Sequence, residues 1–192
     1  KINQQAINKA IAACSKAGGG KVIIPEGTYL TGAIRMQSNV NLVIEQGATL
    51  LFAYEPALYP LVKTRWEGLD IMNYSPCIYA YQAENVAISG TGTIDGNGSL
   101  ETWWPWCGAT KFGYVEGQTT ESQKMPFKPG GDTNRNTLLK MSDNGVPTEQ
   151  RIFGMGHGMR PQLVCLYECQ NILIEGVTML RSPFWVIHPV LS

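Results

Sequence analysis

The sequence predicts an all-β solenoid closed at one end by an amphipathic helix. Three observations carry this prediction: an apolar stripe at helical spacing near residue 1, the loss of that spacing after the glycines at residues 18–20, and a phrase that recurs three times in the rest of the chain. A repeat without helical periodicity is typical of stacked coils, because one coil cannot bury its own apolar face.

The helix is predicted over residues 1–17. Its apolar residues stand at the i, i+4 and i+7 positions of one face, and they are Ile2, Ala6, Ile7, Ala10, Ile11 and Cys14. Three glycines then end it. The open end of a solenoid exposes core and strand edges, so we expect this helix to act as a cap.

Short β-branched runs follow the glycines at once. KVIIP (residues 21–25) and TYLTG (residues 28–32) are closed by Pro25 and Gly32, which is typical of short strands. We therefore expect residues 18–102 to form the early coils.

The recurrent phrase begins with asparagine. NVNLVIEQGATLL starts at Asn39, NVAISGTGTIDG at Asn85 and NILIEGVTMLRSP at Asn171, and each reads as apolar alternation, a glycine turn and a second apolar run. The starts are 46 and 86 residues apart. The first interval predicts about two coils of a little over twenty residues each. The second interval is too long for that and must contain an insertion.

That insertion is predicted over residues 103–153, with further coils over residues 154–192 of what we expect to be a single domain. It is polar and rich in glycine and proline, as in GQTTESQKMPFKPGGDTNRN. A long loop in a compact domain is usually functional rather than slack. It also carries more aromatic residues than disordered segments do, namely Trp103, Trp104, Trp106, Phe112, Tyr114 and Phe127.

Composition excludes several classes of protein. The chain has fifteen basic and fifteen acidic residues, and this balance argues against nucleic acid as a partner. The sequence contains no run of about 18 apolar residues, which is the length that a membrane-spanning helix needs. The five scattered cysteines form no CxxC pair, which favours buried or free thiols over a disulfide framework or a metal site. We expect no cofactor, and the sequence predicts no oligomeric state.

The glycines in GTGTIDGNG do not form a nucleotide cradle. A dinucleotide fingerprint needs its third glycine where Asp95 stands, and a helix should follow. Gly96, Asn97 and Gly98 instead make another turn, so the stretch is predicted to connect strands.

Few residues stand out as candidates for binding. Arg160 precedes a predicted strand and could bind a carboxylate through its two-pronged donor geometry, with Gln162 beside it. In RSPFWVIHPV, alternation places Val186 and His188 on one face and Trp185 and Ile187 on the other. His188 could hydrogen-bond sugar hydroxyls or a uronate, and rings such as those of Trp185 and Trp104 could stack on a pyranose. A satisfied core histidine and a structural arginine remain the alternatives.

Catalytic groups are harder to find. His157, in GMGHGM, has no GxSxG nucleophile motif to partner it. Sugar hydrolysis with inversion needs two carboxylates roughly 6.5 to 9.5 Å apart. Asp70, Asp95, Asp132 and Asp143 show no clustered acidic spacing such as DD or DxD. We therefore name no catalytic residue in this chain.

Several phrases together resemble the N-terminal half of glycoside hydrolase family 28, the polygalacturonases and related pectin hydrolases. They are AGGGKVIIPEGTYLTG, SNVNLVIEQGATLLF, GTGTIDGNG followed by WW, and RPQLV with NILIEGVTMLRSPFWVIHPV. LVKTRWEG and MNYSPCIYAY resemble the bacterial, exo-acting branch most.

The resemblance implies a right-handed parallel β-helix of the pectin-lyase-like type, with a cleft along one sheet. It also implies metal-independent, inverting hydrolysis of α-1,4-linked galacturonic acid in a pectic polysaccharide or oligogalacturonide, and a secreted or periplasmic location. An insertion around WWPW would block one end of the cleft and favour exo-action.

The sequence also departs from the family. The family's catalytic signature of aspartates, Gly-His-Gly and Arg-Ile-Lys lies downstream of the phrase matching SPFWVIHPV, whereas the GHG at residues 156–158 precedes it. We therefore expect the catalytic aspartates beyond residue 192, and the chain to be part of a longer enzyme. Two other functions stay open: a non-catalytic β-helical polysaccharide-binding or adhesion module, and a β-helical pectate lyase.

Overall fold

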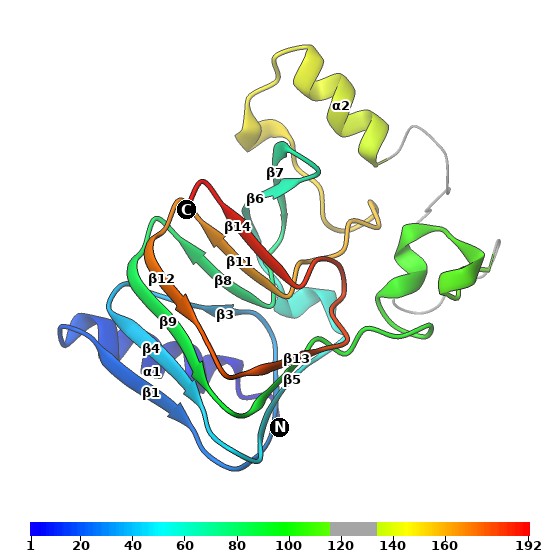
Figure 1. Cartoon of the computed structure of the whole chain (residues 1–192). Helices are drawn as coiled ribbons and strands as arrows, with labels where there is room; N and C mark the ends of the chain where they lie inside the picture. The colour runs from blue at the N-terminus through cyan, green and yellow to red at the C-terminus, as the bar shows by residue number, and fades with distance from the viewer. Residues whose placement is uncertain (116–133) are drawn as a thin grey trace.

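The computed structural model describes residues 1–115 and 134–192. Residues 116–133, which include Phe127 and Asp132 of the predicted insertion, lie outside the described residues. The described chain winds into stacked coils, and each coil gives one strand to each of three parallel sheets (Figure 1). The predicted all-β solenoid is confirmed.

The strands of each sheet stack in chain order. Sheet A holds β1 (Gly20–Ile24), β4 (Val40–Ile44), β9 (Glu84–Gly90) and β12 (Gln170–Ile174). Sheet B holds β2 (Gly27–Thr31), β5 (Ala48–Phe52), β10 (Thr93–Asp95) and β13 (Thr178–Leu180). Sheet C holds β3 (Ile34–Arg35), β8 (Ile78–Tyr81), β11 (Val164–Tyr167) and β14 (Ile187–Val190).

Helix α1 (Gln4–Lys16) lies against the first coil, as Figure 1 shows. Its buried residues are Ile7 and Ile11, both from the predicted apolar stripe. The amides of Gln4 and Asn8 donate to the Ala33 carbonyl at 3.1 and 3.0 Å, and Asn8 Oδ1 accepts from the Arg35 backbone at 2.8 Å. The helix thus covers the apolar end of the coils and pairs with their backbone groups.

The recurrent asparagines form a ladder on one corner of the solenoid. Asn85 Nδ2 donates to Asn39 Oδ1 at 2.8 Å, and Asn171 Nδ2 donates to Asn85 Oδ1 at 2.6 Å. All three have positive φ angles of 64°, 54° and 53° along the chain. Asparagine tolerates this left-handed turn better than most residues, so each phrase starts one coil at the same corner.

The predicted number of coils in the first interval is wrong. Because β4 pairs directly with β9, Asn39 and Asn85 are one coil apart and not two. The extra residues form η1 (Pro56–Leu58) and an antiparallel hairpin of β6 (Leu61–Trp66) and β7 (Leu69–Tyr74). This hairpin lies beside sheet C, outside the coils (Figure 1).

The second interval is also one coil with an excursion. The chain leaves after β10 and returns at β11, at the same corner as the hairpin. Its described elements are η2 (Trp104–Cys107), η3 (Thr110–Phe112), α2 (Arg135–Asp143) and η5 (Thr148–Gln150).

The start of this excursion packs into the core. Trp103 is fully buried, and its ring lies 4.9 Å from that of Tyr54 and 5.5 Å from that of Tyr59. Trp106 is also buried and contacts Trp103 at 5.1 Å. Trp103 and Trp106 of the WWPW stretch are therefore part of the solenoid core.

All five cysteines lie in the described ranges and are free. Neither α-helix of the described residues has the length and apolar character of a bilayer span.

Candidate functional site

The outer face of sheet C carries two rows of side chains. Since side chains alternate along a strand, Tyr79, Cys165 and His188 stand in register in one row. Tyr81, Tyr167 and Val190 form the next row. The alternate residues point into the solenoid, so this face is separate from the core.

The β6–β7 hairpin is fixed to this face by hydrogen bonds. Tyr79 Oη donates to the Lys63 carbonyl at 2.5 Å, and Thr64 Oγ1 lies 3.8 Å from Cys165 Sγ. Gln162 Nε2 donates to the Arg65 carbonyl at 2.9 Å. The hairpin therefore covers the outer face of sheet C over β8 and β11.

A charged cluster lies where the hairpin meets the sheet. Arg65 Nε donates to Asp70 Oδ1 at 2.8 Å, and Tyr167 Oη donates to the same oxygen at 2.7 Å. Lys63 Nζ lies 3.8 Å from Glu168 Oε1 and 5.4 Å from the centre of the Tyr167 ring. Burial and its hydrogen bond to Asp70 raise the pKa of Tyr167, so this tyrosine remains a donor.

Four rings form a ladder beside the cluster. Trp66 stacks on Phe184 at 4.3 Å, Phe184 on Trp185 at 4.8 Å, and Trp185 meets His188 edge-on at 4.7 Å. We define these four residues as the aromatic ladder. The prediction that Trp185 and His188 lie on opposite faces is wrong, because strand β14 begins only at Ile187 and the preceding residues bend.

The surroundings of His188 favour its neutral imidazole form. Burial, and then the positive charge of Arg65, lower the pKa of His188 below 6.5. Its Nδ1 is buried and has no hydrogen-bond partner within the described part of the chain. Neutral imidazole can donate to or accept from a hydroxyl group.

Arg160 lies over the aromatic ladder. Its Nη1 donates to the Pro183 carbonyl at 3.0 Å, and its guanidinium carbon lies 5.1 Å from the centre of the Phe184 ring. Trp104 reaches the same segment, since its Nε1 donates to the Ser182 carbonyl at 2.9 Å. The structure therefore brings Trp104, Arg160, Trp185 and His188 together around residues 182–188.

Comparison with known proteins shows which enzymes this chain resembles. No family model matches the chain. Among solved structures, a hyperthermoactive exopolygalacturonase from Thermotoga maritima is 42% identical, with a TM-score of 0.89, over 100% of this chain and 41% of its own. The family 28 exopolygalacturonase of Yersinia enterocolitica is 25% identical, with a TM-score of 0.65, over 100% of this chain and 34% of its own. A probable polygalacturonase of Vitis vinifera is 26% identical over 100% of this chain and 31% of its own length.

The chain is similar to exopolygalacturonases over its whole length, and these matches support its assignment to the N-terminal portion of glycoside hydrolase family 28. Its solenoid is accordingly the right-handed parallel β-helix of that family. A match of 33% identity to the outer membrane protein assembly factor BamE of Acinetobacter pittii covers only 50% of this chain. The exopolygalacturonase matches, by contrast, span 95% to 100% of the chain and agree with its parallel coils.

The chain spans about a third of the length of the two curated polygalacturonases that it matches over 95% or more of its own length. Its described residues contain no group of three or more histidine, cysteine or acidic side chains arranged to hold a metal ion.

Sequence reasoning missed the hairpin and the residues it brings to the site. Arg65, Asp70, Tyr167 and Phe184 were not among the candidates. The sequence does carry a signal for the hairpin, which is the Glu67-Gly68 pair between its two strands. In the structure these residues have φ angles of 44° and 92°, as a two-residue hairpin turn requires. His157 packs edge-on against Phe153 at 4.8 Å, and Phe153 belongs to the same hydrophobic cluster as Trp66 and Phe184.

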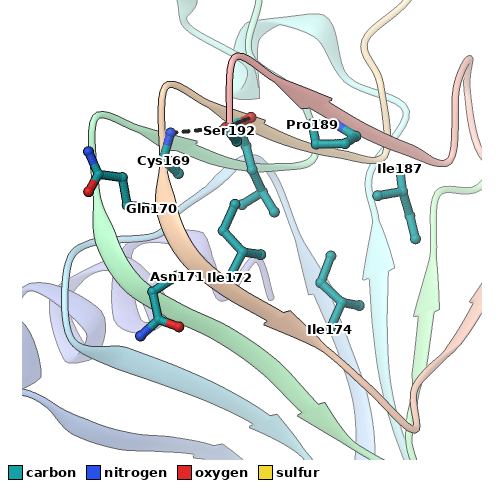
Figure 2. Close-up of a pocket in the computed structure, with 9 residues that line it drawn as sticks. Cys169, Gln170, Asn171, Ile172, Ile174, Ile187, Pro189 and Ser192 are labelled. Atoms are coloured by element: carbon teal, nitrogen blue, oxygen red, sulfur yellow. Dashed lines mark hydrogen bonds between the residues drawn. The ribbon is translucent and has the colours of Figure 1, made fainter.

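A hollow at the last coil of the chain is part of the solenoid interior. Figure 2 shows Ile172, Ile174, Ile187 and Pro189 lining it, with Ser192 Oγ accepting from the Cys169 backbone at 2.9 Å. These side chains continue the inward rows of the coil before, since Ile174 stands in register with Ile88. We therefore assign no ligand to this hollow.

Proposed function

We propose that the chain forms part of a pectin-degrading glycoside hydrolase, acting on the α-1,4-linked galacturonic acid of a pectic polysaccharide or oligogalacturonide. The observation that carries the proposal is the match of the entire chain to an exopolygalacturonase at 42% identity and a TM-score of 0.89. The aromatic ladder and Arg160 support it, because rings stack on sugar faces and a guanidinium pairs with a uronate carboxylate.

The proposed reaction is metal-independent hydrolysis with inversion. In such a reaction one aspartic acid protonates the departing oxygen while another carboxylate activates water on the opposite face of the sugar. We propose that these acids lie beyond residue 192. We also propose a binding role for Trp104, Arg160, Trp185 and His188, and a secreted or periplasmic location.

The test is digestion of polygalacturonate by the whole protein that contains these residues. We expect new reducing ends, products that start as the inverted β-anomer, and unchanged activity in a chelator. An unsaturated product and loss of activity in the chelator would instead identify a lyase. Binding without any cleavage would identify a polysaccharide-binding module.

We further propose that the β6–β7 hairpin restricts the enzyme to exo-action, which is cleavage from the end of the polysaccharide chain. The hairpin stands on the outer face of sheet C and holds it through Tyr79, Gln162 and Tyr167. A long chain laid along this face would meet β6 and β7, so only a chain end could enter.

Replacing residues 61–74 by a short glycine-serine linker should therefore change the products. We expect the unaltered enzyme to release mono- or disaccharides and the shortened enzyme to release longer oligomers, as chromatography of early digests would show. Random oligomers from the unaltered enzyme would contradict exo-action. Melting curves are needed as a control, because the hairpin also covers the buried Tyr79 and Cys165.

A further inference from the structure

The charges of the chain are unevenly distributed along it. Residues 1–25 contain four lysines and no acidic residue, whereas the remaining residues contain eleven basic and fifteen acidic ones. The four lysines are Lys1, Lys9, Lys16 and Lys21, and we define them as the cap lysines. The formal neutrality of the chain therefore hides a positive end on an otherwise acidic molecule, and such an asymmetry acts on charged partners at a distance.

The cap lysines are free to act on a partner. All four are exposed, and none forms a salt bridge within residues 1–115 and 134–192. Elsewhere in the described chain, by contrast, Lys63 lies 3.8 Å from Glu168, and Arg181 pairs with Asp95 at 2.6 Å. The unneutralised positive charge of the cap lysines is thus gathered at one end of the solenoid.

Two of the cap lysines lie on the outer face of α1, which Figure 1 shows at the β1 end of the stacked coils. Lys9 and Lys16 are separated by about two helical turns, or about 10 Å along the helix axis, so they share one face. The buried residues of the helix are Ile7 and Ile11, on the face that packs against the coils. At the helical spacing, Lys9 and Lys16 point away from that face and out from the end of the solenoid.

Lys21 extends this surface onto sheet A. It lies in β1, the first strand of that sheet, where its exposed side chain alternates with the buried Val22. A Cβ atom at Gly20 would lie 3.5 Å from Cys14 Sγ, so β1 begins directly beside the last turns of α1. The other exposed residues of α1 are uncharged, namely Gln5, Ala6, Ala10 and Ala13.

The chemistry of the cap lysines suits a polymer with repeated negative charges. An ammonium group is a compact charge on a flexible stem, without the fixed two-pronged geometry of a guanidinium. Charges about 10 Å apart, which is about one Debye length at 0.1 M salt, act on different charges of one polymer. A small anion would gain little here, because a single exposed ion pair is weak in water.

We propose that the outer face of α1, with Lys9, Lys16 and Lys21, is an electrostatic binding surface for an acidic polysaccharide. The choice of partner rests on the proposed function, because polygalacturonate carries one carboxylate on each sugar. The rest of the chain has an excess of acidic residues and repels the same polymer. The protein therefore meets the polymer with α1 first, and the surface holds it there by charge.

The experiment measures binding of the whole protein that contains these residues to immobilised polygalacturonate and to immobilised neutral galactan. We expect Lys9→Gln combined with Lys16→Gln to weaken binding to polygalacturonate about fivefold at about 0.02 M salt. The difference should disappear at about 0.5 M salt, where exposed charges are screened. Binding to galactan should not change. Glutamine is chosen because its helix propensity is similar to that of lysine.

The matched control combines Lys111→Gln with Lys140→Gln, which removes the same charge from two exposed positions outside α1. This variant should bind polygalacturonate within about twofold of the unaltered protein. Equal losses in the two double variants would assign the effect to net charge and overturn the surface. Melting curves check folding, and if the Lys9 and Lys16 variant does not fold, Lys21→Gln alone should weaken binding about twofold at low salt.

Two further results would overturn the surface. One is a Lys9 and Lys16 variant that binds polygalacturonate at low salt as tightly as the unaltered protein, as it would if another part of the protein covered α1. The other is tighter binding to duplex DNA than to polygalacturonate through the same lysines, which would assign the surface to nucleic acid.

The surface and the proposed function can fail separately. Hydrolysis of a galacturonic acid trisaccharide by the whole protein, together with unchanged polymer binding in the Lys9 and Lys16 variant, would remove the surface and leave the function. Salt-sensitive binding to polygalacturonate through these lysines, without any hydrolysis, would remove the function and leave the surface.

Discussion

Asp70 joins the hairpin to sheet C through a single carboxylate. Burial raises the pKa of Asp70, but hydrogen bonds from Arg65 and Tyr167 and the charges of Arg65 and Lys63 outweigh burial, so the pKa lies below the ordinary 3.8. A carboxyl whose pKa is lower in the folded state adds stability above its unfolded pKa. That stability is lost as the pH falls through the folded value.

Asp70→Asn should therefore lower the free energy of unfolding at pH 7 by about 1 kcal/mol, a value reduced for the partial exposure of the pair. The difference from the unaltered chain should shrink as the pH falls below about 4, because protonated Asp70 also lacks the charge. Urea unfolding at pH 7 and pH 3 measures both values. The exposed Asp143→Asn is the control, and a difference that stays constant between the two pH values would contradict the assigned role.

At the scale of elements, the asparagine ladder sets where each coil turns. Asn85 is its middle member: it donates to Asn39 and accepts from Asn171 while holding a φ of 54°. The side-chain hydrogen bonds and the tolerance of positive φ are separate contributions.

Two substitutions at Asn85 separate them. Asn85→Gly removes the hydrogen bonds and relieves the backbone, and we expect it to cost about 1 kcal/mol. Asn85→Ala removes the bonds and keeps the strain, so it should cost about 1–2 kcal/mol more. Chemical unfolding of both variants tests the order. An alanine variant as stable as the glycine variant would show that the turn is not strained.

Sequence predicted the ladder phrases because the same corner imposes the same demands on Asn39, Asn85 and Asn171. The coil count failed because excursions at one corner add residues without adding coils. The hairpin was missed because Lys63, Arg65 and Asp70 make its runs polar, and those side chains serve contacts with sheet C that local patterns do not show.

The candidate site was predictable only where its residues lie close together in sequence. Trp185 and His188 lie only three residues apart, so the sequence already places them in one segment. Arg160 has the donor geometry for a uronate carboxylate, which made it a candidate. That Trp104, Arg160 and residues 182–188 meet depends on how the long excursion returns, which no local pattern encodes.

At the scale of the whole molecule, stability comes from rows of apolar side chains that run through the coils. One row joins Val22, Leu42, Ile88 and Ile174 in successive strands of sheet A. Each coil contacts only its neighbours, so a defect in a middle coil removes packing on two sides.

Ile88 tests this arrangement, because it is fully buried between Leu42 and Ile174. Ile88→Ala should lower the free energy of unfolding by about 2–5 kcal/mol, and Ile88→Val by about 0.5–1.5 kcal/mol. Leu173→Ala is the matched control, since Leu173 is 46% exposed on the outer side of β12 and should change stability by under about 0.5 kcal/mol. Urea unfolding measures all three. Hydrogen exchange should also show faster opening of β4 and β12 in Ile88→Ala, and a loss below about 1 kcal/mol without such opening would contradict packing between stacked coils as the source of stability.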